Sequence, residues 1–345
     1  MSCAPSLTRI GDLAEAGLIP PDRRAALEAV ATRYAVGVTP AMARLIDPRD
    51  PADPIGLQFL PDEAELRVSG GEDEDPTGDA AHSPVEGIVH RYPDRVLLTP
   101  TYACAVYCRF CFRRERVGPG KARTLGGRAL EEALAYIAAH SGIWEVILTG
   151  GDPLVLSARR LGAILARLDT MAHVKVVRLH TRVPAVAPER VTRSLVRVLR
   201  RTNKAVYVAL HANHPRELTA EARAACARLI DAGVPMLSQS VLLRGVNDDP
   251  KVLEALMRAF VETRIRPYYL HHGDAAPGTA HLRLSLADGQ DLMRALRGRV
   301  SGLAQPTFVY DIPGGFGKVP VGPRYLVGGT VEDPWGRAHS VPGPS

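Results

Sequence analysis

Short apolar runs alternate with longer amphipathic segments over most of the chain. From about residue 95 the runs are rich in Val, Ile, Leu and Tyr, and the segments between them carry apolar residues at helical spacing. Strands that alternate with helices imply right-handed crossovers and a parallel sheet buried on both faces. The predicted strands are residues 95–100, 144–150, 174–180, 204–210, 234–243 and 266–271, and the predicted helices lie near 128–140, 157–168, 188–201, 219–232 and 250–263.

Six such units favour an α/β barrel or partial barrel over a doubly wound sheet. No Gly-x-Gly-x-x-Gly follows the first strand, which argues against a dinucleotide-binding fold. In barrels the chemistry gathers at the C-terminal ends of the strands. The residues at these ends are a group of cysteines after 95–100, the sequence TGGDP at 149–153, His211 and Asp274.

The chain outside these units has a different pattern. Residues 21–47 predict short helices, and 48–87 are rich in Pro, Gly and acidic residues, which predicts an irregular, exposed connection. We therefore expect a helical region and acidic linker over 1–87, a catalytic domain over 88–326, and a loose tail over 327–345.

Composition narrows the class of protein without deciding it. The chain has 345 residues and a net charge of +6. Only five of its 43 basic residues are lysine, and the arginines are scattered over helices, so we do not predict nucleic-acid binding from charge. No apolar stretch reaches membrane-spanning length and no secretory signal opens the chain, so we expect a cytoplasmic protein whose thiols stay reduced.

Three of the five cysteines, Cys104, Cys108 and Cys111, lie within eight residues of one another in a predicted loop after a strand. Three closely spaced thiolates suit an iron–sulfur cluster, and three ligands instead of four leave one iron open for chemistry. The alternatives are structural zinc and simple packing. Zinc is disfavoured because the nearest histidines, His90 and His140, are not at a usual ligand spacing.

Lys318 lies in a glycine-rich loop, YDIPGGFGKVPV at 310–321. Such a loop suits a lysine that forms a Schiff base with pyridoxal phosphate. A Walker-type phosphate loop fails, because Ile312 stands where a glycine is required and Val319 stands where Ser or Thr is required. An ordinary exposed loop lysine is the remaining alternative.

The cysteine spacing, with Phe110 before the third cysteine, resembles the signature loop of radical S-adenosylmethionine (SAM) enzymes, and TGGDP is similar to their glycine motif. The Gly-x-Gly-Lys loop about two hundred residues later makes the chain resemble the lysine 2,3-aminomutase family over 80–326. The segments that carry this likeness include SPVEGIVHRYPDRVLLTPT, CRFCFRRERVG, ILTGGDPL, LHTRVPAVAPERV, LHANHPRELT, SQSVLLRGVND, RPYYLHHGDAAPGTAHLR and VPVGPRYL.

The resemblance implies a partial (β/α)6 TIM-like barrel of the radical SAM type with an N-terminal helical extension, and three cofactors. A [4Fe–4S] cluster would bind to the three cysteines, SAM would chelate its open iron, and pyridoxal phosphate would form a Schiff base with Lys318. The implied cofactor-binding residues are Arg91, Tyr92 and Arg95 at the pyridoxal phosphate, Gly150, Gly151 and Asp152 at SAM, and His211 and Gln239 at the mouth of the site.

The resemblance also implies how a substrate is held. Arg113 would bind its α-carboxylate, and Asp274 and Asp311 would hold the ε-ammonium of lysine, since an unpaired buried charge is costly. The expected reaction is radical migration of the amino group from C2 to C3, which converts L-lysine to β-lysine and makes the protein an isomerase. The alternatives are an aminomutase for glutamate or arginine, a radical SAM RNA-modifying enzyme without pyridoxal phosphate, and a nucleic-acid-binding protein that holds zinc or a cluster.

Two departures from the family pattern concern the length of the chain and the loop of Lys318. The chain is short beside the lysine-degrading members and is expected to lack their C-terminal extension, so the sequence leaves homo-oligomerisation undecided. Short members include enzymes that make β-lysine for elongation factor P. Phe316 replaces a glycine in the loop of Lys318. An external electron donor such as flavodoxin or ferredoxin is also implied.

Overall fold

The computed structural model describes residues 5–118 and 124–341, and its main feature is a nine-stranded sheet in which strands follow one another in chain order. Strands β2 to β8 are parallel, and antiparallel β1 and β9 form the two edges. The bounds are β1 (Ile88–Tyr92), β2 (Arg95–Thr101), β3 (Glu145–Gly150), β4 (Val176–Thr181), β5 (Ala205–His211), β6 (Met236–Val241), β7 (Arg266–His271), β8 (Thr307–Ile312) and β9 (Gly317–Pro320).

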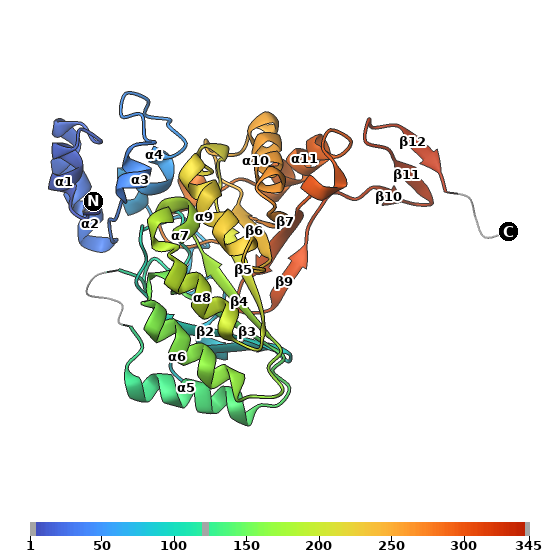
Figure 1. Ribbon diagram of the computed structural model, residues 1–345. Coiled ribbons are helices and arrows are strands. Elements are labelled where there is room, and N and C mark those ends of the chain that lie inside the picture. Colours follow the sequence, from blue (N-terminus) through green and yellow to red (C-terminus); the bar gives the residue numbers. More distant parts are fainter. Residues whose placement is uncertain (1–4, 119–123, 342–345) are drawn as a thin grey trace.

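Helices connect the parallel strands and cover the outer face of the sheet (Figure 1). The six predicted strand–helix units are confirmed, and the sheet then continues with β8 and β9. Several of these helices begin where a Ser, Thr or Asp side chain accepts a backbone N–H of the first turn. The helices are α5 (Gly127–Ala139), α6 (Ala158–Asp169), α8 (Arg193–Arg201), α9 (Ala220–Ile230), α10 (Pro250–Glu262) and α11 (Leu286–Leu296), with a short α7 (Val183–Val186) after β4.

Strand β4 shows how the sheet places polar side chains on its inner face. Val177 and Leu179 are fully buried in the core beneath the helices. Arg178 and His180, which alternate with them, line a central cavity. Because successive side chains of a strand point to opposite faces, one mostly apolar run supplies both the core and the cavity wall.

The N-terminal region contains α1 (Ile10–Glu15), α2 (Arg24–Arg33), α3 (Pro40–Ala43) and α4 (Gly56–Phe59). It contacts the barrel and the cysteine loop through hydrogen bonds such as those of Thr39 with Val186 O and of the Arg109 amide with Gln58 O. The segment 48–87 is irregular, as expected, but the prediction that it is exposed is wrong for Phe59, Glu65 and Asp79, which are buried. They are buried because they contact the loop of the three cysteines and the barrel edge, which local periodicity does not reveal.

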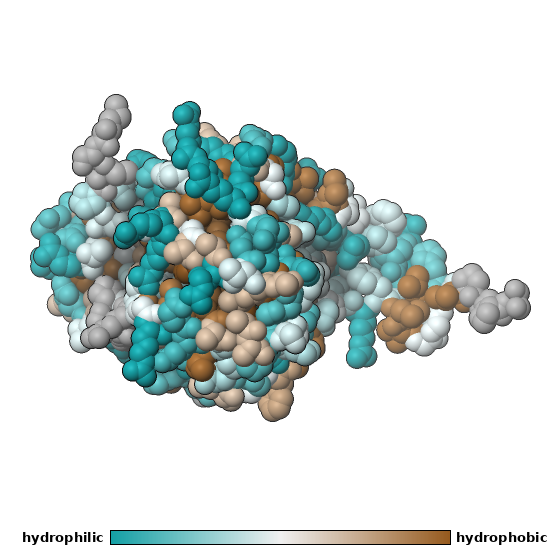
Figure 2. Space-filling view, turned by 60° about the horizontal axis from the view of Figure 1, so that its bottom comes forward, coloured by the Kyte–Doolittle hydropathy of each residue, from teal (hydrophilic) through white to brown (hydrophobic). Residues whose placement is uncertain are grey.

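At the opposite side of the barrel, residues 326–340 form a small antiparallel sheet where we expected a loose tail (Figure 1). Its strands are β10 (Leu326–Val327), β11 (Thr330–Glu332) and β12 (Ala338–Ser340). Gly328 and Gly329 both have positive φ, which is the requirement of a tight two-residue hairpin turn. The sheet projects from the body with apolar side chains exposed (Figure 2).

Candidate active site

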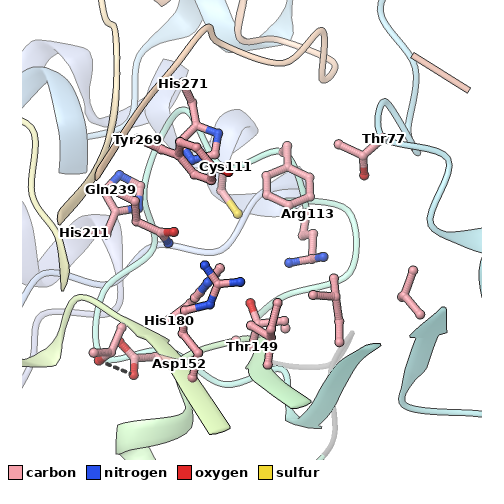
Figure 3. A pocket seen from close by; sticks show the side chains of 18 of the residues that line it. Thr77, Cys111, Arg113, Thr149, Asp152, His180, His211, Gln239, Tyr269 and His271 are labelled. Atoms are coloured by element: carbon pink, nitrogen blue, oxygen red, sulfur yellow. Dashed lines mark hydrogen bonds between the residues drawn. The ribbon is translucent and has the colours of Figure 1, made fainter. Parts of the chain in front are cut away.

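One cavity of about 590 Å³ inside the curved sheet receives side chains from every strand between β1 and β9. Figure 3 shows side chains that converge on it from several strands and from the cysteine loop. All the site residues that the sequence singled out line this cavity, although they are scattered over more than two hundred positions of the chain. They are Arg91, Tyr92, Arg95, Cys104, Cys108, Cys111, Arg113, Gly150, Gly151, Asp152, His211, Gln239, Asp274, Asp311 and Lys318.

The three thiols lie in the loop after β2 and face the cavity. Burial raises the pKa of Cys104 well above its usual range and that of Cys111 to about 11, so metal binding must displace their protons. Nη1 of Arg182 lies 3.0 Å from Sγ of Cys108. Among the described residues, no three Cys, His, Asp or Glu side chains could hold a single metal ion. A cluster spreads its thiolate ligands over several irons, and three thiols on one loop would suit such a group.

Of the two glycines at the end of β3, Gly150 packs on the Thr99 side chain of β2 and Gly151 packs on the backbone of the cysteine loop. The amide of Gly151 donates to Thr101 O at 2.8 Å, and a Cβ atom on Gly151 would lie 2.3 Å from Ala103 O. Gly150 has φ of 97°, and a Cβ atom there would lie 2.0 Å from Cγ2 of Thr99. Both positions therefore require glycine for contact, which goes beyond the needs of an ordinary turn.

Asp152, which follows the glycine pair, is engaged by protein donors. Its carboxylate accepts from the Thr181 hydroxyl at 2.7 Å and from the backbone amides of Leu154, Arg182 and Val183 at 3.0, 2.7 and 3.2 Å. It thereby ties the C-terminal end of β3 to that of β4. A direct role toward SAM stays a prediction.

Lys318 lies on β9, directly opposite Asp311 of β8 in the antiparallel register. Its Nζ atom donates to Oδ2 of Asp311 at 2.6 Å and lies 3.1 Å from Nδ1 of His271. The lysine thus points into the cavity as an ion pair between neighbouring strands. Phe316, in the β8–β9 loop, is 80% exposed and is not among the residues that line the cavity.

Side chains join the two edge strands of the sheet at this lysine. The hydroxyl of Tyr92 on β1 accepts from the backbone amide of Lys318 at 2.8 Å. Nη1 of Arg91, also on β1, lies 3.8 Å from Oδ1 of Asp311. The guanidinium of Arg95 stacks over the Tyr92 ring at 3.7 Å. Side chains that the sequence assigned to cofactor binding therefore connect the two edges of the sheet at the site.

Asp79 connects two arginines of the site, and the sequence did not single it out. Its Oδ1 atom accepts from Arg91 at 3.0 Å, and its Oδ2 atom accepts from Nη2 of Arg113 at 2.8 Å. Although burial alone would raise the pKa of Asp79, Arg113 and Arg91 hold it below its usual value. An ionic chain thus runs from Lys318 to Arg113 through two aspartates and one arginine.

Asp274, in the loop after β7, differs from Asp311. No cation lies within ion-pair distance of Asp274 among the described residues. Burial, and then the charge of Asp311, raises its pKa to about 7. Asp311 by contrast contacts Lys318 and Arg91. Asp274 therefore has no ion-pair partner among the described residues, although the charges of Lys318 and Arg113 act on it from further away and lower its pKa.

Three imidazoles, those of His180, His211 and His271, also face the cavity (Figure 3). Burial lowers the pKa of each well below its usual range, so all three are neutral at neutral pH. His211 contacts Asn213, whereas Nε2 of His180 has no hydrogen-bond partner within the described part of the chain. His180 and His271 were missed because a histidine near a strand end shows no spacing that indicates a site. The signal that could have found them is their alternation with core residues along β4 and β7.

Comparison with known proteins identifies the family. The model of the radical SAM superfamily matches residues 98–256, and a model named for lysine-2,3-aminomutase matches residues 293–333. The L-lysine 2,3-aminomutase of Clostridium subterminale is 42% identical over 85% of this chain and 70% of its own length. The chain belongs to the lysine 2,3-aminomutase family.

Other members of the family differ in size and in the substrate that they are named for. The L-lysine 2,3-aminomutase of Escherichia coli is 36% identical and matches over 84% of this chain and 83% of its own length. The glutamate 2,3-aminomutase of Clostridioides difficile is 38% identical over 87% of this chain and 71% of its own length. The family contains both lysine and glutamate enzymes, so membership does not fix the substrate.

Membership confirms the predicted class of enzyme and fold. The protein is a radical SAM aminomutase, hence an isomerase, on an α/β barrel, and the superfamily implies a [4Fe–4S] cluster and SAM. The thiols facing one cavity and Gly151 packed against their loop fit these two groups. Within the described ranges no helix has the length and apolar character to cross a membrane.

Proposed function

We propose that this protein is a pyridoxal phosphate-dependent L-lysine 2,3-aminomutase in which Lys318 binds the cofactor. The observation that carries the proposal is the unpaired carboxylate of Asp274 in the cavity that also contains Lys318 and the three thiols. The family membership limits the reaction to amino-group migration, and Asp274 selects the substrate.

The residues around Lys318 suit pyridoxal phosphate. Arg91 and Arg95 supply cationic groups for a phosphate, and the buried Nε atom of Arg91 has no hydrogen-bond partner among the described residues. When bound, pyridoxal phosphate supplies an aldehyde that links covalently to amines and allows nitrogen to migrate between adjacent carbons, while SAM at the cluster supplies the radical chemistry.

The protein's own part is to hold and enclose the substrate. Arg113 lies across the cavity with its guanidinium directed inward (Figure 3), where it would bind an α-carboxylate. The strands and the cysteine loop surround the cavity and keep water from the reacting atoms. Placement of the substrate carbon next to the radical source is the main catalytic contribution.

Asp274 favours lysine over other amino acids. A lysine ε-ammonium would supply the cation that Asp274 lacks, whereas the side chain of glutamate would place a second negative charge in this part of the cavity. Alanine would leave Asp274 unpaired. Arginine also carries a cation, but its guanidinium is larger and planar. An arginine substrate is therefore one outcome of the test below.

The test uses anaerobically reconstituted protein. We expect a visible Schiff-base band after addition of pyridoxal phosphate, fixation of the cofactor by borohydride, and loss of both in Lys318→Ala. Absence of the band in the wild-type protein would contradict this function and favour a radical SAM enzyme that modifies RNA.

Product analysis then settles the substrate. We incubate the loaded enzyme separately with lysine, arginine, glutamate and alanine, and analyse β-amino products. β-Lysine from lysine is expected. Formation of a β-amino product only from glutamate or arginine would refute the role of Asp274.

We further propose that the protein is a cytoplasmic enzyme and that it takes electrons from a flavodoxin or ferredoxin.

A further inference from the structure

The imidazole of His271 contacts the amine of Lys318. His271 is the last residue of β7, and its Nδ1 atom lies 3.1 Å from Nζ of Lys318. A lysine ammonium has only donors, so Nδ1 accepts from Nζ and the proton of the neutral imidazole lies on Nε2. A second bond from Nζ to Asp311 holds the lysine in this position.

The surroundings keep this imidazole in place and neutral. The Tyr269 ring meets it edge-on, with the ring centres 5.7 Å apart. Oδ2 of Asp311 lies 3.9 Å from Nδ1, and Lys318, His211 and His180 are its other electrostatic neighbours. Burial, and then the charge of Lys318, lowers the pKa of His271 well below its usual range. Nδ1 is therefore unprotonated at neutral pH, and its lone pair is the acceptor for Nζ of Lys318.

Exchange of the cofactor between Lys318 and a substrate needs a group of this kind. An amino acid enters with an ammonium group, which must lose one proton before its nitrogen can attack the cofactor carbon. Once bonded to that carbon, the substrate nitrogen loses a second proton and the nitrogen of Lys318 gains one, so that the bond to Lys318 can break. The released lysine amine then gains the other proton, so two protons in all pass from the substrate nitrogen to Lys318. The number of protons and electrons is unchanged, and only a carrier between the two nitrogens is required.

We infer that His271 is this carrier: its Nδ1 atom takes each proton that the substrate nitrogen loses and delivers it to Nζ of Lys318 as the lysine is released. The inference rests on the proposed use of pyridoxal phosphate. Since a neutral imidazole holds an extra proton only weakly in this environment, it returns the proton readily to a lysine that already forms an ion pair with Asp311.

The test measures exchange without turnover. Reconstituted protein loaded with pyridoxal phosphate, with no reductant added, is mixed rapidly with L-lysine, and the change in the Schiff-base absorbance is followed. The variants are His271→Asn, which keeps a hydrogen-bond acceptor close to the position of Nδ1 but carries no proton, and His271→Ala. We expect exchange to slow by about 100-fold in both.

Two further measurements separate proton transfer from a structural role. Added imidazole should restore much of the exchange rate in His271→Ala, and the amount of bound cofactor per chain should stay at the wild-type value in both variants. His272→Asn is the matched control, because the His272 imidazole contacts Leu284 O and does not line the cavity. It should exchange at the wild-type rate.

The outcomes are distinct. Wild-type exchange rates in both variants would overturn the inference and leave the proposed function intact. Slow exchange with less bound cofactor and no rescue by imidazole would also overturn it, since His271 would then only support the fold. If the wild-type protein forms no Schiff base at all, the proposed function fails and the inference fails with it.

Discussion

Asp274 and Asp311 form a pair in the sequence argument, but the structure gives them different partners. Asp311 is engaged by Lys318 and Arg91, whereas Asp274 is partly buried and has no ion-pair partner among the described residues. A buried carboxylate without a counter-charge is unfavourable unless a ligand supplies the charge. Recognition of a substrate ammonium should therefore depend mainly on Asp274.

The first prediction concerns binding. Asp274→Asn should weaken lysine affinity about 100-fold, because the ε-ammonium loses its buried counter-charge. Titration of the Schiff-base spectrum with lysine measures this affinity. Alanine has no ε-ammonium and serves as the control ligand, so its affinity should be the same in both proteins. Equal lysine affinities would show that Asp274 does not recognise the ammonium.

The second prediction concerns stability against pH. The pKa of Asp274 is about 7 when folded and about 3.9 when unfolded, so the folded state retains a proton that the unfolded state loses. The resulting penalty is absent below pH 3.9, grows as the pH rises, and is complete above pH 7. Asp274→Asn should thus raise the melting temperature of ligand-free protein at pH 8 and leave it nearly unchanged at pH 4. Thermal scans at pH 4 and pH 8 measure this. An equal shift of the melting temperature at the two pH values would show that the assignment is wrong.

The third prediction concerns Asp79. Asp79→Asn leaves Arg113 without its full counter-charge and Arg91 with only the more distant Asp311, and should lower the free energy of unfolding by about 3 kcal/mol. Chemical denaturation of ligand-free protein measures it. Asp231→Asn is the control, because its ion pair with Arg264 is exposed and should cost under about 1 kcal/mol. Similar losses in the two variants would contradict the buried ionic chain.

At the scale of elements, the site is assembled by contacts between the ends of strands. The end of β3 fits against β2 and the loop after it only because Gly150, at Thr99, and Gly151, at the loop backbone, carry no side chain. The β8–β9 hairpin places Lys318 opposite Asp311 by register alone. In both arrangements the path of the backbone, and not the side-chain rotamer, brings the chemical groups together.

The fourth prediction follows from the glycine contact. Gly151→Ala would bring a Cβ atom against the backbone of Ala103 and Tyr102, which has to shift the cysteine loop. We expect iron content after anaerobic reconstitution to fall several-fold, together with the visible absorbance of the cluster. Gly302→Ala, with no atom within 4 Å of the added Cβ, is the control and should bind iron normally. Normal iron content in Gly151→Ala would show that the loop tolerates the shift.

At the scale of the whole molecule, the N-terminal region is part of the site's support. Glu65 is fully buried, and its carboxylate accepts from Arg109 at 2.9 Å and from Arg114, both beside the cysteines. The backbone amide of Arg109 donates to Gln58 O at 2.9 Å. These contacts join the residues before position 87 to those after it, where the sequence predicts a domain boundary. That boundary stays a prediction of chain organisation.

The fifth prediction tests this coupling. Glu65→Gln leaves Arg109 and Arg114 without their shared charge, and should lower the free energy of unfolding by about 3 to 5 kcal/mol in a single transition. Circular dichroism and the fluorescence of Trp144, in the barrel, should report the same midpoint. Separate midpoints would show that the N-terminal region unfolds independently. Glu63→Gln, whose partner Arg23 is partly exposed, should have little effect.

The sequence by itself determined the strand–helix units, the three thiols and Lys318. Apolar periodicity and residue spacing are local properties, so they survive without knowledge of the fold. Only the tertiary structure decided which charges meet. Asp79 and Arg113 are 34 positions apart and His271 and Lys318 are 47 apart. Such pairs form only where strand ends and loops come together around the cavity. A local sequence pattern carries no information about which distant residues meet there. For the same reason the buried residues of 48–87 looked exposed in the sequence.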